Sequence, residues 1–307
     1  MTEKHHFVHR WDEKNRRVGV SGLSDFDLRQ TLECGQCFRW NREQDGSYTG
    51  VAFSRVINIR QDDRELTIEN CTLDDFLTIW IEYFDLTRDY GKIKKVLEAD
   101  DPVMERVISF GQGIRLLKQD PWETLISFII SQNANIPRIK KCIESLCCQF
   151  GAPIQQYRGK TYFAFPTPAE IIEGEPGALD TCRFGYREDY IIKAARQISQ
   201  DDGKTLFEAA SLEPGDAERY LLGLPGVGPK VAGCILLFAM GSYSSFPIDV
   251  WMKRIMNQLY GVDEGNLAQI AAFAQNKFGE YGGFAQQYLF YYAREGKNRK
   301  ETERGPC

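Results

Sequence analysis

Histidine is nearly absent from this chain of 307 residues. The three histidines, His5, His6 and His9, all lie within the first nine residues, in a terminal segment that we expect to be mobile. A Ser-His-Asp or Cys-His mechanism, or a zinc ion held by histidine, would have to recruit that segment. The scarcity therefore argues against these chemistries.

Long apolar runs and clustered cysteines are also missing. The run from Val231 to Met240 is well short of the roughly 20 residues that cross a bilayer, and the polar N-terminus does not resemble a signal peptide. Nine cysteines are scattered along the chain, as expected for reduced, mostly buried thiols in a cytosolic or nuclear protein. Cys34 and Cys37 have no second pair or histidine nearby in sequence to complete a metal site, and Cys307 stands alone near the C-terminus.

An excess of positive charge is the last absence. The formal net charge of −5 argues mildly against a nucleic-acid partner. Basic residues are nevertheless grouped beside loops, although most charge runs are only solvated helix faces. The groups are Arg138, Lys140 and Lys141; Arg183, Arg187, Lys193 and Arg196; and Lys230, Lys253 and Arg254.

The N-terminal part of the chain is predicted to be rich in strands. With 43% apolar and 26% charged residues, the composition is that of a globular protein with ample core. Short alternating runs between polar turns predict strands at 47–51, 56–59 and 66–68. Two helices are expected to follow, near 73–84 and 93–99.

From about residue 102 the pattern is helical almost throughout. The segments 120–123 and 167–170 both predict a capping box, with a polar N-cap, proline at the first helical position and glutamate at the third. We therefore predict an α+β fold, with an antiparallel sheet domain over 1–112 and an all-α domain over 113–307. Further helices are expected near 135–150, 188–199, 216–222, 229–240, 250–260, 267–278 and 284–295.

A glycine-rich turn at residues 224–229 opens the helix that begins near 229. Gly226 and Gly228 permit the backbone angles of a tight hairpin, and the free N–H groups at the start of the helix suit a phosphate. Lys230 follows in the first turn, beside apolar residues. Burial and the positive end of the helix would lower its pKa and make it a nucleophile for sugar aldehydes. Taken alone, the turn favours the simpler role of phosphate contact.

Asp249 stands nineteen residues after Lys230, a separation of about one helix and a return loop. That length brings its carboxylate back toward the hairpin. Aspartate before a helix most often caps it. A carboxylate here can also stabilise the positive charge that develops on a deoxyribose when its glycosidic bond breaks. We expect Asp249 to do both.

The segment 224–230 together with Asp249 resembles the helix–hairpin–helix DNA glycosylases, and four further segments resemble 8-oxoguanine DNA glycosylase in particular. They occur in the family's order and span nearly the whole chain, so they are far more specific than the hairpin. The four segments are Cys34 to Trp40, Ser131 to Ile139, Phe184 to Arg187 and Ala285 to Phe290.

The resemblance implies a bifunctional glycosylase and AP lyase that removes 8-oxoguanine, preferentially opposite cytosine, from double-stranded DNA. Lys230 attacks C1′ of the extruded nucleotide and forms an imine, and β-elimination then nicks the strand on the 3′ side. Asp249 orients and stabilises that transition state. Because the amine is the electron sink, no metal or organic cofactor is expected.

The resemblance also assigns the base pocket. The carbonyl of Gly35 accepts a hydrogen bond from the N7–H that distinguishes 8-oxoguanine from guanine. Phe290 and Cys234 sandwich the base, and Gln286 reads its Watson–Crick edge. Without the resemblance, Gly35 reads as a turn glycine, Phe290 and Cys234 as core residues, and Gln286 as a surface residue.

Extrusion of a nucleotide leaves a gap in the duplex that the protein must fill. By resemblance, Asn133 inserts there with Tyr186 as an aromatic wedge. Arg138 and Arg187 resemble the pair that donates to N3 and O2 of the orphaned cytosine; phosphate contact is the alternative for either arginine. Gly226 and Gly228 are expected at the DNA backbone.

Three positions depart from the family pattern. Trp251 replaces a histidine that contacts phosphate, Ala134 replaces an asparagine, and Gly233 replaces a carboxylate. We expect a monomer that binds DNA containing an oxidised purine and no membrane, located at the nucleoid in a bacterium or in the nucleus in a eukaryote. Rival interpretations are a monofunctional alkylbase glycosylase, a non-catalytic DNA-binding module and, more remotely, an aldolase.

Overall fold

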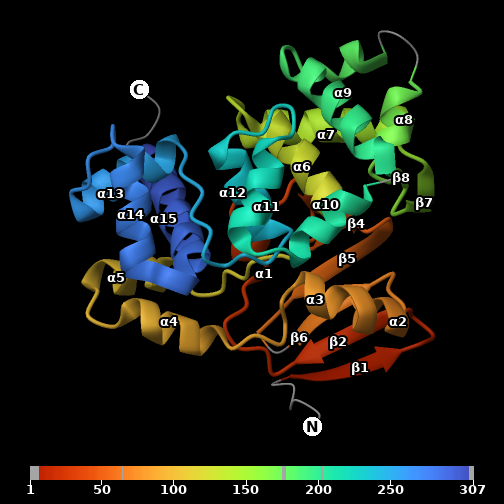
Figure 1. Ribbon diagram of the computed structural model, residues 1–307. Helices are drawn as coiled ribbons and strands as arrows, with labels where there is room; N and C mark the ends of the chain where they lie inside the picture. The colour runs from red at the N-terminus through yellow and green to blue at the C-terminus, as the bar shows by residue number, and fades with distance from the viewer. Residues whose placement is uncertain (1–6, 64, 175–177, 202, 304–307) are drawn as a thin grey trace.

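The computed structural model describes residues 7–63, 65–174, 178–201 and 203–303, with side chains of the last helix described as far as residue 296. It confirms the predicted α+β fold, because an antiparallel sheet is followed by a mostly helical region (Figure 1). The expectation that His9 lies in a mobile segment is wrong: it belongs to a strand and pairs with Val20. His5, His6 and Cys307 lie outside the described residues.

Within the described residues, six strands form one antiparallel sheet in the order β1-β2-β6-β5-β4-β3. Its core face is built by cross-strand pairs of buried apolar side chains, such as Val18 with Ile68 and Val20 with Leu66. The three strands predicted individually are confirmed as β4, β5 and β6. The strands are β1 (Val8–Asp12), β2 (Arg17–Ser21), β3 (Trp40–Arg42), β4 (Tyr48–Ala52), β5 (Arg55–Gln61) and β6 (Glu65–Glu69).

The helix predicted over 73–84 is present but is not one continuous α-helix. Its middle turn is a π-helix, in which the Ile81 N–H bonds to the carbonyl of Phe76. Over twelve residues, apolar periodicity does not separate a π turn from an α turn, so the sequence did not indicate it. The elements here are α1 (Leu28–Glu33), α2 (Leu73–Asp75), η1 (Phe76–Trp80) and α3 (Ile81–Tyr83).

The next two helices, α4 (Tyr90–Glu98) and α5 (Pro102–Phe110), belong to the larger core. Their side chains Ile93 and Val107 pack in the same cluster as Leu289 near the C-terminus. Figure 1 shows both helices beside the blue C-terminal helices. The boundary after residue 112 places α4 and α5 in the sheet domain and stays a prediction.

The remaining helices surround one large apolar core. The helices predicted here are confirmed to within a few residues, except that the last one continues past 295 to Glu303. The short helical elements at 178–182, 199–201, 204–211 and 279–281 were not predicted. In chain order, the helical elements are α6 (Pro121–Ser131), α7 (Ile136–Phe150), α8 (Pro168–Ile172), η2 (Ala178–Cys182), α9 (Arg187–Ile198), η3 (Ser199–Asp201), α10 (Lys204–Glu208), η4 (Ala209–Ser211), α11 (Pro214–Leu222), α12 (Pro229–Phe238), α13 (Val250–Tyr260), α14 (Leu267–Phe278), η5 (Gly279–Tyr281) and α15 (Gly282–Glu303).

The prediction that this region is all-α is wrong in one place. A two-stranded antiparallel hairpin, β7 (Pro153–Tyr157) and β8 (Lys160–Phe163), follows α7. Arg158 and Gly159 form its turn with φ values of 49° and 79°. Positive φ at both central residues matches the twist of a hairpin, and Arg-Gly is a weaker signal for it than Asn-Gly. Tyr162 of β8 packs against the sheet domain at Val51.

The two predicted capping boxes have different outcomes. At α8 both arms are present: Thr167 accepts from the Glu170 N–H, and Glu170 accepts from the Thr167 N–H. At α6 the Asp120 side chain caps the helix, but the Glu123 carboxylate lies 3.6 Å from Arg39. The ion pair joins the helix to the chain just before β3, so tertiary contact has replaced the second arm of the box.

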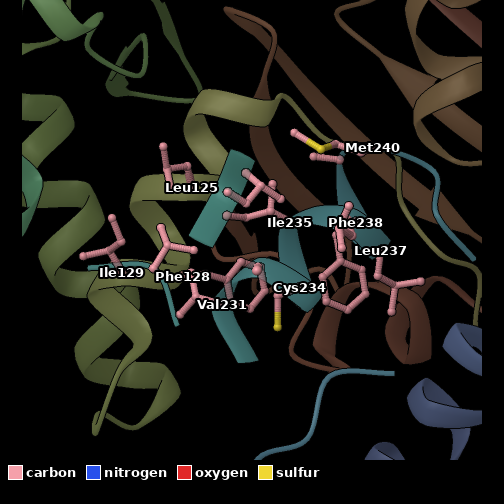
Figure 2. Packing of buried hydrophobic residues seen from close by; sticks show 14 of the residues in the cluster. Leu125, Phe128, Ile129, Val231, Cys234, Ile235, Leu237, Phe238 and Met240 are labelled. Atoms are coloured by element: carbon pink, nitrogen blue, oxygen red, sulfur yellow. The ribbon is translucent and has the colours of Figure 1, made fainter. Parts of the chain in front are cut away.

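Helices α6 and α12 pack against each other in the centre of the core. Figure 2 shows Leu125, Phe128 and Ile129 of α6 facing Val231 and Ile235 of α12. The rings of Phe128 and Phe238 stack with centroids 5.6 Å apart. This packing fixes the start of α12 against the end of α6, where the candidate site lies.

Candidate active site

One cavity of about 660 Å³ brings together residues from both ends of the chain. It is large enough for a nucleobase and within the usual range of ligand pockets. Helices α6, α12, α13 and α15 and the turn after α1 contribute to its wall. All six residues predicted for catalysis and base recognition line it: Lys230, Asp249, Gly35, Cys234, Gln286 and Phe290.

Lys230 is the second residue of α12 and is half-buried. Its Nζ lies 3.3 Å from the Ser131 hydroxyl, at the end of α6. The same nitrogen lies 5.0 Å from the centroid of the Phe128 ring, within range of a cation–π contact. The amine is therefore held at the cavity by one polar and one aromatic neighbour, and it does not extend into open solvent.

Asp249 caps α13, as predicted, because its carboxylate accepts the Met252 N–H at 2.8 Å. It is half-buried and lines the cavity together with Lys230. Within the described residues no ion pair of 4.0 Å or less joins the two side chains. Lys230 lowers the pKa of the Cys234 thiol and Asp249 raises it, so both side chains lie close to Cys234 on α12.

The glycine turn places the start of α12 next to the α6–α7 loop. Gly226 has a φ of 78°, and a Cβ there would lie 2.7 Å from Cβ of Tyr190, so glycine is required twice over. Its carbonyl accepts from the Gln132 side chain at 2.8 Å. Gly228 is the N-cap of α12 and provides no side-chain cap. The N-terminal N–H groups of α12 therefore lack a side-chain acceptor at the cap, as an anion site needs.

Three side chains form the walls that would surround a flat ligand. Burial raises the pKa of the Cys234 thiol to about 11, and Asp249 adds to this while Lys230 opposes it, so the thiol is neutral at pH 7. Phe290 is half-buried. Gln286 is buried, and its Oε1 has no hydrogen-bond donor among the described residues. An unpaired buried amide oxygen is costly, and a donor on a bound ligand would satisfy it.

Gly35 follows the C-terminus of α1 with a φ of 89°. A Cβ at this position would lie 3.0 Å from both Phe290 and Arg294. The turn glycine is thus required by its backbone conformation and by close approach to α15. Its backbone lies directly at the edge of the Phe290 ring.

The loop between α6 and α7 carries Asn133, which is exposed and has a φ of 48°. Arg187, at the start of α9, is buried and braces this loop. Its guanidinium donates to the carbonyls of Gln132 at 2.8 Å, Phe184 at 3.0 Å and Asn133 at 3.2 Å. Arg187 therefore stabilises the loop conformation in which Asn133 is exposed to solvent. Its role as a partner of cytosine stays a prediction.

Arg138 and Tyr186, in contrast, are exposed beside this loop. Arg138 is in the first turn of α7, and Tyr186 is 57% exposed with its ring 4.7 Å from the Arg187 guanidinium carbon. Their side chains are accessible to a macromolecular ligand. Trp251 and Ala134, two of the departures from the family pattern, line the cavity.

Three residues of the site have no role predicted from the sequence: Ser131 and Phe128, which neighbour the Lys230 amine, and Gln132, which joins the loop to the hairpin. Ser131 and Phe128 carry no distinguishing local pattern, because a helix-end serine and a core phenylalanine are common. Gln132 is a polar residue directly after an apolar helix, which is a weak signal for a tertiary hydrogen bond.

The described residues contain no group of three or more His, Cys, Asp or Glu side chains arranged to hold a metal ion. Of the nine cysteines, the eight in the described ranges are free, and all of these except Cys148 are buried, as predicted. Burial raises the pKa of Cys34 to about 11 and that of Cys37 further. Among the described helices, none contains an apolar stretch of the length that crosses a membrane.

Two family models match adjoining parts of the chain. The model for the 8-oxoguanine DNA glycosylase N-terminal domain matches residues 20–125, and the model for the HhH-GPD superfamily of base excision DNA repair proteins matches residues 126–278. A "Probable N-glycosylase/DNA lyase" of Methanothermobacter thermautotrophicus is 30% identical over 89% of this chain and 95% of its own length. The "N-glycosylase/DNA lyase" of Saccharomyces cerevisiae is 30% identical over 87% of this chain and 83% of its own length.

Solved structures agree with these matches. The structure of "MBOgg1 in complex with low affinity DNA ligand" has a TM-score of 0.89 at 48% identity and covers 94% of this chain and 99% of its own. The Clostridium acetobutylicum 8-oxoguanine glycosylase/lyase, in complex with double-stranded DNA containing cytosine opposite 8-oxoguanine, has a TM-score of 0.88 at 42% identity. It covers 95% of this chain and 98% of its own.

Proposed function

Because the chain belongs to the 8-oxoguanine DNA glycosylase family, we propose that it excises 8-oxoguanine from double-stranded DNA and nicks the strand at the resulting abasic site. It is a bifunctional N-glycosylase and DNA lyase, as the names of its relatives indicate. The observation that carries the proposal is the shared cavity: an amine, a carboxylate and the four base-recognition residues meet at one place.

We propose that Lys230 is the nucleophile. Its Nζ attacks C1′ of the extruded nucleotide, the bond from C1′ to N9 breaks, and the base leaves with the electron pair and takes up a proton. The sugar ring then opens to an iminium ion on Lys230. Loss of a proton from C2′ expels the 3′ phosphate, and water releases the amine. The half-buried position of Lys230 beside Ser131 supports this role.

Asp249 is proposed to stabilise the positive charge that develops on the sugar as the glycosidic bond breaks. Its position is fixed by the cap bond to Met252, so the carboxylate needs little reorganisation when the charge appears. Electrostatic stabilisation by groups that are already in place is usually the largest single contribution to catalysis. The lack of a direct ion pair with Lys230 leaves room for the sugar between the two groups.

The base pocket follows from donor and acceptor complementarity. The Watson–Crick edge of guanine offers N1–H and the N2 amino group, and the unpaired Oε1 of Gln286 can accept from it. Phe290 and the neutral thiol of Cys234 provide apolar faces for stacking. The Gly35 carbonyl is proposed to accept the N7–H that guanine lacks.

We also propose a preference for cytosine opposite the lesion. The exposed guanidinium of Arg138 offers donors that fit N3 and O2 of cytosine, whereas adenine presents an amino group on that edge. Asn133, held outward by Arg187, is proposed to fill the gap left by the extruded base. The protein is proposed to act as a monomer, since one chain supplies all of these side chains.

Borohydride trapping tests the central step. Wild-type protein incubated with a duplex carrying 8-oxoguanine opposite cytosine should become covalently attached to DNA when borohydride reduces the imine. The Lys230→Gln variant should lose both excision and trapping. Lys204→Gln, which removes a surface lysine paired with Glu208, is the matched control and should retain both. Excision by wild type without any trapped complex would indicate a water mechanism, as in monofunctional glycosylases.

A further inference from the structure

The turn that carries Gly35 has four successive carbonyls, and three of them are held by long side chains from distant parts of the sequence. Arg294 donates through Nη2 to Glu33, Gln287 donates through Nε2 to Cys34 at 3.0 Å, and Gln119 donates through Nε2 to Gln36 at 2.8 Å. The Gly35 carbonyl has no hydrogen-bond donor among the described residues.

The arrangement leaves free the one carbonyl that is proposed to read the base. The Gly35 carbonyl belongs to the peptide unit between residues 35 and 36. The preceding peptide unit contains the Cys34 carbonyl and the following one contains the Gln36 carbonyl, and both of these carbonyls are anchored. Because each peptide unit is planar, anchoring both neighbours restricts how the middle unit can rotate. This restriction matters because glycine by itself is the most flexible residue.

Two of the three anchors, Gln287 and Arg294, lie on helix α15 next to the base-recognition residues. Gln287 is 2% exposed and lies on α15, one residue from Gln286. Arg294 lies two turns further along the same helix, with its guanidinium carbon 5.8 Å from the centroid of Phe290. Its Nη1 would contact a Cβ at Gly35. Helix α15 thus supplies a stacking ring, an edge reader and two anchors, although it is far from α1 in sequence (Figure 1).

The Gln36 side chain anchors the turn to the buried backbone behind it. It is fully buried and makes three hydrogen bonds: it donates to the carbonyls of Thr31 at 2.9 Å and Arg115 at 2.7 Å, and it accepts from the Leu117 N–H at 2.9 Å. A network in which every amide group is paired specifies one conformation. The turn is therefore fixed on the core side as well as on the α15 side.

We propose that Gln287, Arg294 and Gln119 are positioning residues for the discrimination of 8-oxoguanine from guanine. They hold the Gly35 carbonyl in one direction, where it accepts the N7–H of 8-oxoguanine and meets the N7 lone pair of guanine. A carbonyl held in this direction attracts the N7–H of 8-oxoguanine and repels the N7 lone pair of guanine. A carbonyl that is free to rotate distinguishes the two bases less well. The inference rests on the proposed function and adds the source of its selectivity.

The experiment compares binding of the lesion with binding of the normal base. In the non-cleaving Lys230→Gln background, Kd is measured for two duplexes that differ only in 8-oxoguanine or guanine at one position. Gln287→Met, Arg294→Met and Gln119→Met should each reduce the ratio of the two affinities by about fivefold, the effect of one hydrogen bond. Arg294→Lys keeps a donor and should retain most of the ratio. Gln275→Met, an exposed substitution on α14, is the control and should leave it unchanged.

A second measurement separates positioning from folding. With Lys230 intact, nicking of a preformed abasic site by the same variants should fall by a smaller factor than the affinity ratio, because that reaction involves no base. An unchanged affinity ratio in Gln287→Met, Arg294→Met and Gln119→Met would overturn the inference, and so would an equal loss for both duplexes. Failure of wild type to excise 8-oxoguanine or to nick the abasic site would instead overturn the proposed function.

Discussion

The Nζ of Lys230 lies 3.3 Å from the hydroxyl of Ser131, so the proposed nucleophile is tied to the last residue of a neighbouring helix. That hydroxyl in turn donates to the Phe128 carbonyl at 2.8 Å and is oriented by it. Ser131 therefore offers its lone pairs to the amine. Because α6 and α12 also share the apolar contacts of Figure 2, the amine and its partner are held in one rigid unit.

We predict that Ser131→Ala slows excision by about fivefold, since one hydrogen bond that orients the amine is worth about 1 kcal/mol. The measurement is single-turnover excision of 8-oxoguanine opposite cytosine. Ser109→Ala, which removes an exposed hydroxyl on α5, should leave the rate unchanged. Equal rates for both variants and wild type would show that Ser131 does not orient the amine.

Replacing Asp249 by asparagine or by alanine should separate its role as a helix cap from its role in stabilising positive charge. Asparagine caps a helix about as well as aspartate, so Asp249→Asn should keep the melting temperature, whereas Asp249→Ala should cost about 1 kcal/mol of stability. Both variants should lose excision by about a hundredfold or more, because neither has the negative charge. Full excision by the asparagine variant would reduce Asp249 to a structural cap, as a non-catalytic DNA-binding module would require.

The two arginines near Asn133 should behave differently. Arg187→Ala leaves three carbonyls without their donor and should lower the free energy of unfolding by about 2 kcal/mol. Arg138 is exposed, so Arg138→Ala should change stability by less than about 0.5 kcal/mol. The Arg138 variant should instead lose about tenfold of the preference for cytosine over adenine opposite the lesion. Thermal unfolding and excision from the two duplexes test both statements; a preference that survives in Arg138→Ala would remove that residue from base reading.

Stability should fall between about pH 5 and pH 7 because of Glu123. Burial raises the pKa of its carboxyl from 4.5 to about 7, although Arg39 opposes the shift. In that window the folded chain holds a proton that the unfolded chain has released, so raising the pH favours unfolding. Glu123→Gln cannot ionise, and its melting temperature relative to wild type should rise from pH 5 to pH 7.5. A constant difference over this range would contradict the shift.

Much of the molecule was predictable because its signals are local. The strands β4 to β6, the α8 capping box and most helices after residue 102 follow from alternation, caps and apolar periodicity in single segments. The Gly226 turn followed from the need for a positive φ, which the structure confirms at 78°. The hairpin at 153–163, the π turn at 76–80 and the strand position of His9 were missed, because short segments carry little periodicity and their conformation depends on what packs against them.

The sequence by itself determined the chemistry available to this protein: an amine in the first turn of a helix, a carboxylate one helix later, and almost no histidine. Only the tertiary structure decided that residues 35, 230, 249 and 286 share one cavity, that Arg187 braces a loop, and that Arg294 and Gln287 anchor the turn at Gly35. The reason is physical. Short-range patterns reflect backbone preferences over a few residues, whereas a hydrogen bond between residues more than 250 positions apart exists only once the apolar core has brought α1 and α15 together.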